Sequence, residues 1–324
     1  MLEVKDLHVK FHSRDREAVG GVSFTIQDGE ILGLVGESGS GKSVTAQAIM
    51  GILDTPPAYV RAGQILYQGR DLLTRPEEER RQIRGAEIAM IFQDALSALN
   101  PVFPVGWQIG ESLRERAGMS RADARRRTVE LMDLVRIPAA AKRLGDYPHQ
   151  FSGGMRQRVM IAMALALDPK VLIADEPTTA LDVTVQAQIM DLLADLRRDL
   201  GMALVLITHD LGVVAGVADR IAVMYAGRIV EHADVHALYR APAHPYTKGL
   251  LESIPRLDVR GQALSSIRGL PPNLMAIPSG CPFHPRCPYV QPVCVDEVPH
   301  DLVLADGRTS ACHFAQEVHD DRDG

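Results

Sequence analysis

The sequence has no run of about eighteen apolar residues, the length that a membrane-spanning helix needs. It also has no basic excess, because 35 lysines and arginines face 41 aspartates and glutamates, for a net charge of −6. A general nucleic-acid binder has a basic footprint, so we expect no nucleic acid partner. The first residues, MLEVKDLHVKF, lack the pattern of a signal peptide. We therefore expect a cytosolic chain that serves a membrane, if at all, as a peripheral partner.

A glycine-rich stretch, Gly36 to Ser43, reads GESGSGKS and matches the phosphate-loop pattern G-x-x-x-x-G-K-[ST]. The apolar run ILGLV before it is of strand type, and VTAQAIMGIL after it begins as a helix should. This context favours a phosphate loop over a plain glycine-rich turn. Glycines let backbone N–H groups surround a phosphate, and the helix N-terminus adds partial positive charge. Lys42 can reach the β- and γ-phosphates, and the Ser43 hydroxyl can ligate Mg²⁺.

The order of apolar patterns predicts an α/β fold, in a chain of 324 residues that is long enough for a large domain with an appendage. Three helical patterns between residues 101 and 165 predict a helical subdomain inserted between strands, at about residues 94–165. Short apolar or alternating runs predict strands at 2–11, 19–26, 31–35, 63–67, 87–92, 171–176, 203–210, 220–225 and 227–232.

Polar residues stand where several of these strands end. Asp175 and Glu176 end a buried strand, where Asp175 would hold Mg²⁺ and Glu176 would polarise the attacking water. His209 ends another strand at the same edge, which favours a γ-phosphate contact over a structural role. Gln93 could sense the γ-phosphate or be an ordinary loop residue. Phe11 could stack on a nucleotide base or belong to the core.

The segment Phe151-Ser152-Gly153-Gly154-Met155-Arg156-Gln157-Arg158 resembles the LSGGQ-like signature of ABC-transporter ATPases. The resemblance spans roughly residues 1–235 and departs from the usual pattern at Met155, where Gln is common, and at Phe11, where Tyr is frequent. Other segments resemble family motifs in the same order: Phe11 the A-loop, Gln93 the Q-loop, Val171–Glu176 the Walker B strand, Ala180-Leu181-Asp182 the D-loop and His209 the switch histidine.

The resemblance implies an ATPase with an ABC-type core at residues 1–240, whose mixed sheet carries an antiparallel β subdomain. It implies ATP and Mg²⁺ as cofactors, with catalytic roles for Lys42, Gln93, Glu176 and His209. It implies magnesium ligation at Ser43, Gln93 and Asp175. Implied nucleotide contacts, some of them to the ATP of a head-to-tail partner, are Phe11, Gly36, Ser38, Gly39, Ser40, Gly41, Lys42, Ser43, Val44, Ser152, Gly153, Gly154 and Asp182.

Two further segments, QDALSALNPVFPVGWQI (93–109) and AHPYTKGLLESIP (243–255), resemble the ATPases of dipeptide and oligopeptide importers. This resemblance implies a second, related ATPase subunit, two transmembrane permease subunits, an extracellular peptide-binding protein and a position at the cytoplasmic face of the membrane. Import of another small solute, such as nickel or a metal chelate, is the alternative. An ABC ATPase acting on DNA or ribosomes would need a coiled-coil insertion, a second cassette or a basic face, and none is visible.

Cysteine is absent from the first 280 residues, and Cys281, Cys287, Cys294 and Cys312 follow within residues 241–324, which we expect to form a C-terminal extension. Disulfides are the poorest interpretation in a reducing cytosol. Structural zinc usually takes closer C-x2-C pairs, whereas four thiolates without such pairs suit an iron–sulfur cluster. The resemblance to peptide-importer ATPases implies a [4Fe-4S] cluster, with Zn²⁺ as the alternative. We expect the acidic tail at 315–324 to be disordered.

Overall fold

The computed structural model describes residues 1–11, 17–179, 181–254, 267–273 and 276–321. The chain forms two compact units. The first comprises Met1–Ile26, Ile31–Thr74 and Leu206–Gly324, and the second comprises Gln27–Glu30 and Arg75–Val205. The boundary that we predict between residues 240 and 241 stays a prediction, because the first unit contains residues from both sides of it.

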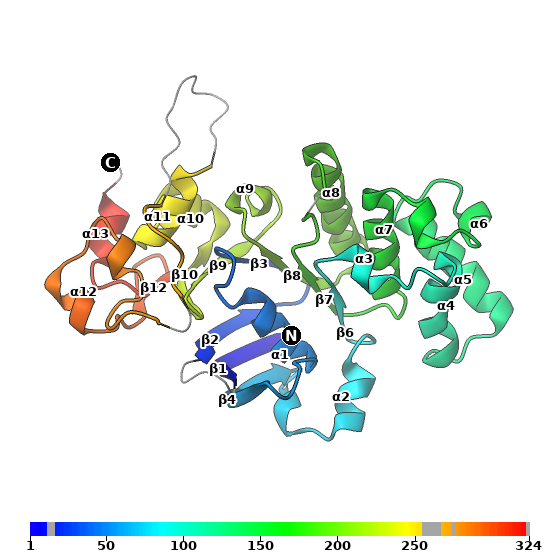
Figure 1. The fold of residues 1–324 in the computed structure, drawn as a ribbon, viewed down its shortest axis with the longest axis horizontal. Helices are drawn as coiled ribbons and strands as arrows, with labels where there is room; N and C mark the ends of the chain where they lie inside the picture. The colour runs from blue at the N-terminus through cyan, green and yellow to red at the C-terminus, as the bar shows by residue number, and fades with distance from the viewer. Residues whose placement is uncertain (12–16, 180, 255–266, 274–275, 322–324) are drawn as a thin grey trace. The chain divides into compact units, whose positions relative to one another are not determined.

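An antiparallel sheet occupies the N-terminal part of the first unit (Figure 1). Its strands alternate buried apolar with more exposed side chains, as a sheet with one covered face requires. The antiparallel β subdomain is therefore confirmed, although one strand begins at residue 58 rather than at 63. In spatial order the strands are β2 (Glu17–Ile26), β1 (Leu2–Phe11), β4 (Ala58–Tyr67) and β5 (Arg70–Asp71).

A mixed sheet forms the rest of the first unit's strand framework. In this sheet β3 (Ile31–Val35) and β9 (Arg220–Tyr225) pair in parallel, whereas β9 and β10 (Arg228–Asp234) form an antiparallel hairpin closed by Ala226 and Gly227, both at positive φ. All five residues of β3 are buried, which fits a strand covered on both faces. In spatial order the strands are β11 (Leu302–Val303), β12 (Thr309–Ser310), β10, β9 and β3.

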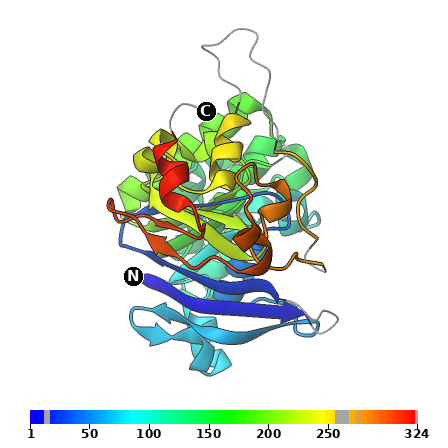
Figure 2. The same cartoon turned by 90° about the vertical axis from the view of Figure 1, so that its left-hand side faces the viewer.

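Short helices fill the first unit. Figure 2 shows the orange and red C-terminal segment beside the yellow segment that precedes it. Strand β8 (Ala203–Thr208) crosses the boundary between the two units. The helices are α1 (Lys42–Met50), η1 (Leu72–Thr74), α9 (Leu211–Val214), α10 (Val235–Arg240), α11 (Pro245–Glu252), η3 (His284–Arg286), α12 (Pro292–Asp296) and α13 (Ala315–Asp320).

The expectation of a disordered tail is wrong for residues 315–321, because residues 315–320 form helix α13. Ala315 and Val318, three residues apart on this helix, are buried. Ala315 packs with Ala243 and Leu304, and Lys248 forms an ion pair with Asp321 at 3.0 Å. Burial of these apolar side chains therefore outweighs the acidic composition that predicts disorder.

The second unit places helices around two parallel strands, and the predicted inserted helical subdomain is confirmed. Its core includes the fully buried Ile109, Leu131 and Val159, one from each of the three long helices of the insertion. The strands are β6 (Ile88–Ile91) and β7 (Val171–Asp175). The helices are α2 (Glu77–Ile83), α3 (Ala95–Ala98), α4 (Val105–Glu115), α5 (Arg121–Leu134), α6 (Ala140–Arg143), η2 (Pro148–Gln150), α7 (Gly153–Ala164) and α8 (Val183–Leu200).

Within the described ranges, none of the helices combines the length and the apolar content that crossing a bilayer would require.

Candidate functional site

The phosphate loop connects β3 to α1 in the first unit, as predicted. Gly36 is required by space, because a Cβ there would lie 2.2 Å from the backbone oxygen of Met224. Gly41 caps α1 at φ 105°, and a Cβ there would lie 2.8 Å from the Ala18 oxygen. Both neighbours are backbone atoms, which cannot swing aside. The loop therefore passes close against its own unit at two positions, and this fixes its curve.

The Lys42 ammonium lies across the curve of the loop. Its Nζ donates to the carbonyl oxygens of Gly36 at 2.7 Å and Glu37 at 3.0 Å. The side chain is buried, at 4% exposure. A lysine in this position places its positive charge inside the curve of the loop, where a phosphate loop binds an anion. Ser38, Gly39, Ser40, Ser43 and Val44 belong to the same loop and to the first turn of α1.

Glu37 is held from the distant C-terminal region of the same unit. Its carboxylate accepts two hydrogen bonds from Arg286, and its N–H donates to the Tyr246 hydroxyl. Sequence reasoning missed both partners, which lie 249 and 209 residues away. The motif pattern leaves the second loop position open, so no local signal could have revealed them.

The second unit brings Gln93, Asp175 and Glu176 to the same ends of its two parallel strands, β6 and β7. Gln93 Nε2 donates to Glu176 Oε2 at 3.0 Å, and the Thr179 hydroxyl donates to the same oxygen at 2.9 Å. Asp175 is nearly buried at the end of β7, with 4% exposure. Two adjacent carboxylates at this edge can hold a cation and orient a water molecule. Thr179 is a third residue that sequence reasoning missed.

The signature segment begins helix α7. Ser152 caps the helix and its hydroxyl accepts from the Met155 N–H at 3.4 Å, while Gly153 follows as the first helical residue. A Cβ on Gly154 would lie 2.6 Å from Val185 Cγ1 in α8. Asp182, the cap of α8, accepts from the Val185 N–H at 3.0 Å. The signature and Asp182 are thus neighbours within the second unit, whereas Ala180 of the predicted D-loop lies outside the described residues.

Two predicted contacts belong to the first unit, with the phosphate loop. Phe11 is the last residue of β1, where it is half-buried and pairs with Ala58 of β4. His209 follows β8 and is exposed. Gln93, Asp175, Glu176, the signature and Asp182 all belong to the second unit.

The four cysteines lie close to one another in the first unit. The Cys281 N–H donates to the Cys294 carbonyl at 2.8 Å. Burial raises the pKa of Cys287 to about 11, and the nearby thiols of Cys281 and Cys294 raise it further. Burial likewise raises the pKa of Cys312 to about 12, with the other three thiols adding to the shift. Nevertheless, no three His, Cys, Asp or Glu side chains of the described residues form a group placed to hold a metal ion.

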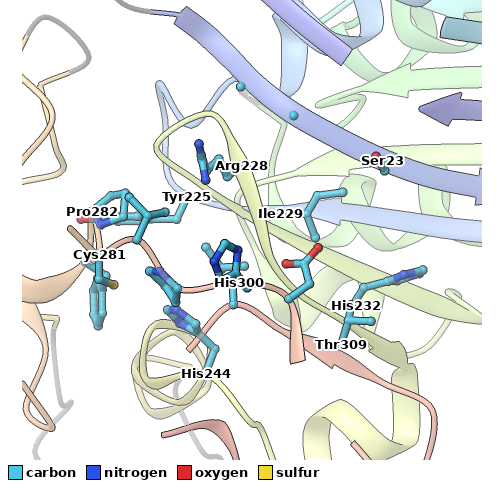
Figure 3. Close-up of a pocket in the computed structure, with 18 of the residues that line it drawn as sticks. Ser23, Tyr225, Arg228, Ile229, His232, His244, Cys281, Pro282, His300 and Thr309 are labelled. Carbon is cyan, nitrogen blue, oxygen red and sulfur yellow. The ribbon is translucent and has the colours of Figure 1, made fainter. Parts of the chain in front are cut away.

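A cavity of about 280 Å³ lies between the antiparallel sheet, the β9–β10 hairpin and residues 281–312, which carry the four cysteines and are called the cysteine segment below (Figure 3). Its lining includes His232, His244, His300 and Cys281. Burial lowers the pKa of His244 to about 3, so this imidazole is neutral at physiological pH. No residue of the predicted nucleotide site lines this cavity.

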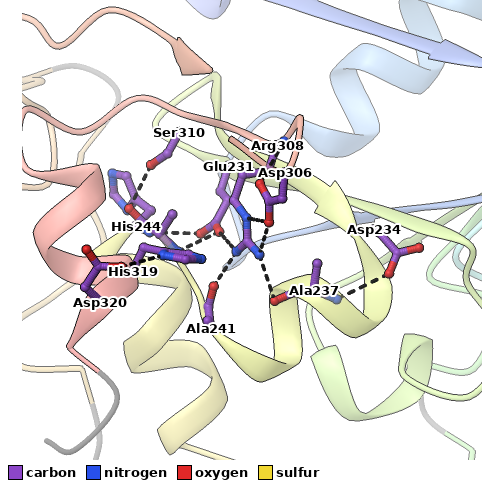
Figure 4. A network of polar contacts seen from close by, with 11 residues as sticks. Glu231, Asp234, Ala237, Ala241, His244, Asp306, Arg308, Ser310, His319 and Asp320 are labelled. Carbon is purple, nitrogen blue, oxygen red and sulfur yellow. Dashed lines mark hydrogen bonds and ion pairs between the residues drawn. The ribbon is translucent and has the colours of Figure 1, made fainter. Parts of the chain in front are cut away.

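A buried polar network anchors the C-terminal region in the first unit (Figure 4). Glu231 is fully buried and accepts from the backbone N–H groups of Ala243 at 2.7 Å and His244 at 3.0 Å. Arg308 approaches the same carboxylate at 3.6 Å and also pairs with Asp306. Burial raises the pKa of Glu231 to about 7 against the lowering effect of these hydrogen bonds.

Two family models, a solved structure and two full-length relatives are similar to this chain. The ABC transporter family model matches residues 19–179, and the model for the oligopeptide/dipeptide transporter C-terminal region matches residues 230–294. A solved dimeric ATP-binding cassette in a post-hydrolysis state, bound to ADP and Pi, is 29% identical with a TM-score of 0.64. The match covers 72% of this chain and 99% of that one.

Two full-length relatives are more similar in sequence. The oligopeptide transport ATP-binding protein of Salmonella typhimurium is 51% identical over 96% of this chain and 93% of its own length. The dipeptide transport ATP-binding protein of Bacillus subtilis is 51% identical over 96% of this chain and 94% of its own length. The chain is therefore an ATPase of the ABC transporter family and belongs to the group that contains the oligopeptide and dipeptide transport ATP-binding proteins.

Proposed function

We propose that this chain hydrolyses ATP to drive the import of dipeptides or oligopeptides through a membrane transporter. The observation that carries the proposal is the extent of the similarity. It covers at least 93% of the two relatives described above and includes the C-terminal region at 230–294, beyond a generic cassette. Both relatives are named for peptide transport, which favours peptides over nickel or a metal chelate as the cargo.

In this proposal the phosphate loop binds the nucleotide in the first unit. Lys42 exchanges its contacts to loop carbonyls for the β- and γ-phosphate oxygens, and the N-terminus of α1 adds partial positive charge. Gly36, Ser38, Gly39, Ser40, Gly41 and Val44 present the backbone to phosphate. Phe11 stacks on the base, and His209 contacts the γ-phosphate.

The reaction requires a base and a cation, for which the second unit offers adjacent carboxylates. Glu176 polarises the attacking water. Gln93, which donates a hydrogen bond to the Glu176 carboxylate, senses the γ-phosphate. Asp175, Ser43 and Gln93 would hold Mg²⁺; their hydroxyl, amide and carboxylate oxygens are the donors that this ion prefers. When bound, Mg²⁺ neutralises charge that develops on the phosphate oxygens.

The signature serves a second ATPase subunit. Ser152 and Gly153 are exposed at the start of α7, so they can close over the ATP of a head-to-tail partner, together with Gly154 and Asp182. We propose that this partner is a related but different chain. Two permease subunits would hold the pair at the cytoplasmic face of the membrane, and an extracellular peptide-binding protein would deliver the cargo.

We also propose that Cys281, Cys287, Cys294 and Cys312 hold a [4Fe-4S] cluster, with Zn²⁺ as the alternative. Support comes from the donor chemistry, because four thiols from one region can supply a complete ligand set once deprotonated. Their side chains would have to turn toward a common centre. The cluster has a structural role in this proposal, and no step of ATP hydrolysis passes through it.

Isolation of the assembly tests the proposed partners. Tagged chain is purified from detergent-solubilised membranes, and every chain that accompanies it is identified. We expect one related ATPase subunit and two permease subunits, without nucleic acid. Recovery of a homodimer that carries no membrane protein would contradict the proposed assembly.

A further inference from the structure

The phosphate loop is tied to the C-terminal region through Glu37. Arg286 Nη1 lies 2.6 Å from Glu37 Oε2, and Nη2 lies 3.0 Å from Oε1, which makes a two-point ion pair. The Arg286 side chain is only 5% exposed and that of Glu37 25%, so solvent screens the pair less than an ordinary surface ion pair.

The backbone of Glu37 is fixed from the same region. Its N–H donates to the Tyr246 hydroxyl at 2.8 Å, and Tyr246, in α11, is fully buried. Its carbonyl accepts from Lys42 Nζ at 3.0 Å and from the Ser40 N–H at 3.2 Å. One residue of the loop therefore joins the lysine of the phosphate site to two side chains from beyond residue 240.

The partners of Glu37 are themselves rigidly packed. The Arg286 guanidinium lies over the rings of Tyr225 and Phe283, at 5.9 and 6.0 Å from their centroids. Its Nε donates to the Arg268 carbonyl at 3.0 Å. Tyr246 contacts the same two rings, at centroid distances of 4.6 and 5.4 Å. A side chain held on this many sides is pre-organised, so it can fix the position of Glu37 rather than follow it.

The pairing of Glu37 with Arg286 matters for nucleotide binding because of the charges involved. Glu37 places a carboxylate in a loop that binds an anion, where an unpaired negative charge would repel the phosphates. Arg286 neutralises it with two hydrogen bonds. A guanidinium keeps its positive charge at any working pH, so the ion pair with Glu37 is a standing feature of the loop.

We infer that Arg286 and Tyr246 are positioning residues for ATP binding: from the C-terminal region they hold Glu37 so that the phosphate loop is shaped, and its carboxylate neutralised, before the nucleotide arrives. Nucleotide binding and the packing of the segment around Arg286 are then thermodynamically coupled, and each favours the other. Arg286 immediately precedes Cys287, so the cysteine segment is part of the structure that supports the loop. The inference rests on the loop binding the nucleotide, as proposed above.

The test measures the Kd for ADP on the full-length chain, with thermal unfolding as a check on folding. Arg286→Gln should raise the Kd about tenfold, the scale typical of coupled sites, because Glu37 is left unpaired beside the phosphates. Adding Glu37→Gln should recover most of this loss, since the repelling charge is gone. Tyr246→Phe removes only a hydroxyl and should raise the Kd by a smaller factor.

A matched control and a reference variant separate the possible failures. Lys248→Met breaks the ion pair with Asp321, which also ties α11 to the C-terminal segment but does not touch the loop, and it should leave the Kd unchanged. Lys42→Ala should abolish binding; if it does not, the loop is not the nucleotide site. If Lys42→Ala abolishes binding but folded Arg286→Gln and Tyr246→Phe bind like the wild type, the inference alone is overturned. A double variant no better than Arg286→Gln would likewise overturn the role of charge. If Arg286→Gln does not fold, Tyr246→Phe decides.

Discussion

Gln93 and Glu176 join the ends of two neighbouring parallel strands through a side-chain hydrogen bond of 3.0 Å. Glu176 has a φ of 45°, which is uncommon for a residue with a side chain. Thr179 holds the same carboxylate oxygen at 2.9 Å. A backbone in this region costs roughly 1–3 kcal/mol and persists where the surroundings require it. The structure therefore accepts strain to present this carboxylate, which fits a general base better than a chance loop residue.

Replacing Glu176 by Gln should separate nucleotide binding from hydrolysis. The amide keeps the size of the side chain but cannot take a proton, so we expect ATP turnover to fall about a hundredfold or more. The Kd for ATP should stay close to that of the wild type. In the presence of ATP the variant should form a stable dimer that size-exclusion chromatography detects. Glu130→Gln, an exposed carboxylate paired with Arg127, is the matched control. Wild-type hydrolysis by Glu176→Gln would refute the assigned role.

The close contact between Gly154 and Val185 predicts a size limit in the signature. Gly154→Ala places a Cβ 2.6 Å from Val185 Cγ1, and the valine in α8 has little rotamer freedom to retreat. We expect a loss of about 1–3 kcal/mol in the free energy of unfolding, measured by urea denaturation, partly offset by alanine's higher helix propensity. Adding Val185→Ala should restore much of it. Equal stability of Gly154→Ala and wild type would show that the helices separate at no cost.

The buried Glu231 predicts a pH dependence of stability. Its pKa is about 7 in the folded chain against an ordinary value of 4.5, so the folded state retains a proton that the unfolded state releases. This contribution is fully present below about pH 4.5, falls as the pH rises, and is lost above about pH 7. The full span is about 3 kcal/mol as an upper bound.

Glu231→Gln should abolish that fall, while its absolute stability is lower because the amide cannot accept every hydrogen bond that the carboxylate accepts. The measurement is the free energy of unfolding at pH 5 and pH 8 in both proteins. Glu130→Gln, an exposed site, should keep the wild-type dependence. The same slope in Glu231→Gln and in wild type would contradict the buried, protonated state.

The sequence predicted the elements whose signal is local. The phosphate loop, the apolar strands at 31–35 and 171–176, and the three long helices of the insertion all follow from spacing within one segment. The pairing of Glu37 with Arg286 could not be predicted, because it joins residues 249 positions apart that carry no motif. Helix α13 was missed because its two buried residues stand in an acidic stretch.

The cysteine proposal predicts the metal content of the chain. Anaerobically purified protein should be brown and contain about four irons per chain. Chelation should release the iron, expose four reactive thiols and lower the melting temperature, because a bound metal adds its binding free energy to the fold. Cys287→Ser should reduce the iron content. Colourless protein with stoichiometric zinc would favour Zn²⁺ over the cluster. Metal-free protein of unchanged stability would contradict both the cluster and the zinc site.

Peptide uptake by the reconstituted transporter tests the central proposal most directly. The chain is assembled with its membrane and ATPase partners in liposomes, and uptake of a labelled dipeptide or oligopeptide is followed with the peptide-binding protein outside and ATP at the side of this chain. We predict ATP-dependent uptake that is lost when Glu176→Gln replaces the wild-type chain. Uptake of nickel or a chelate without any peptide uptake, or peptide uptake that does not depend on ATP, would contradict the proposal.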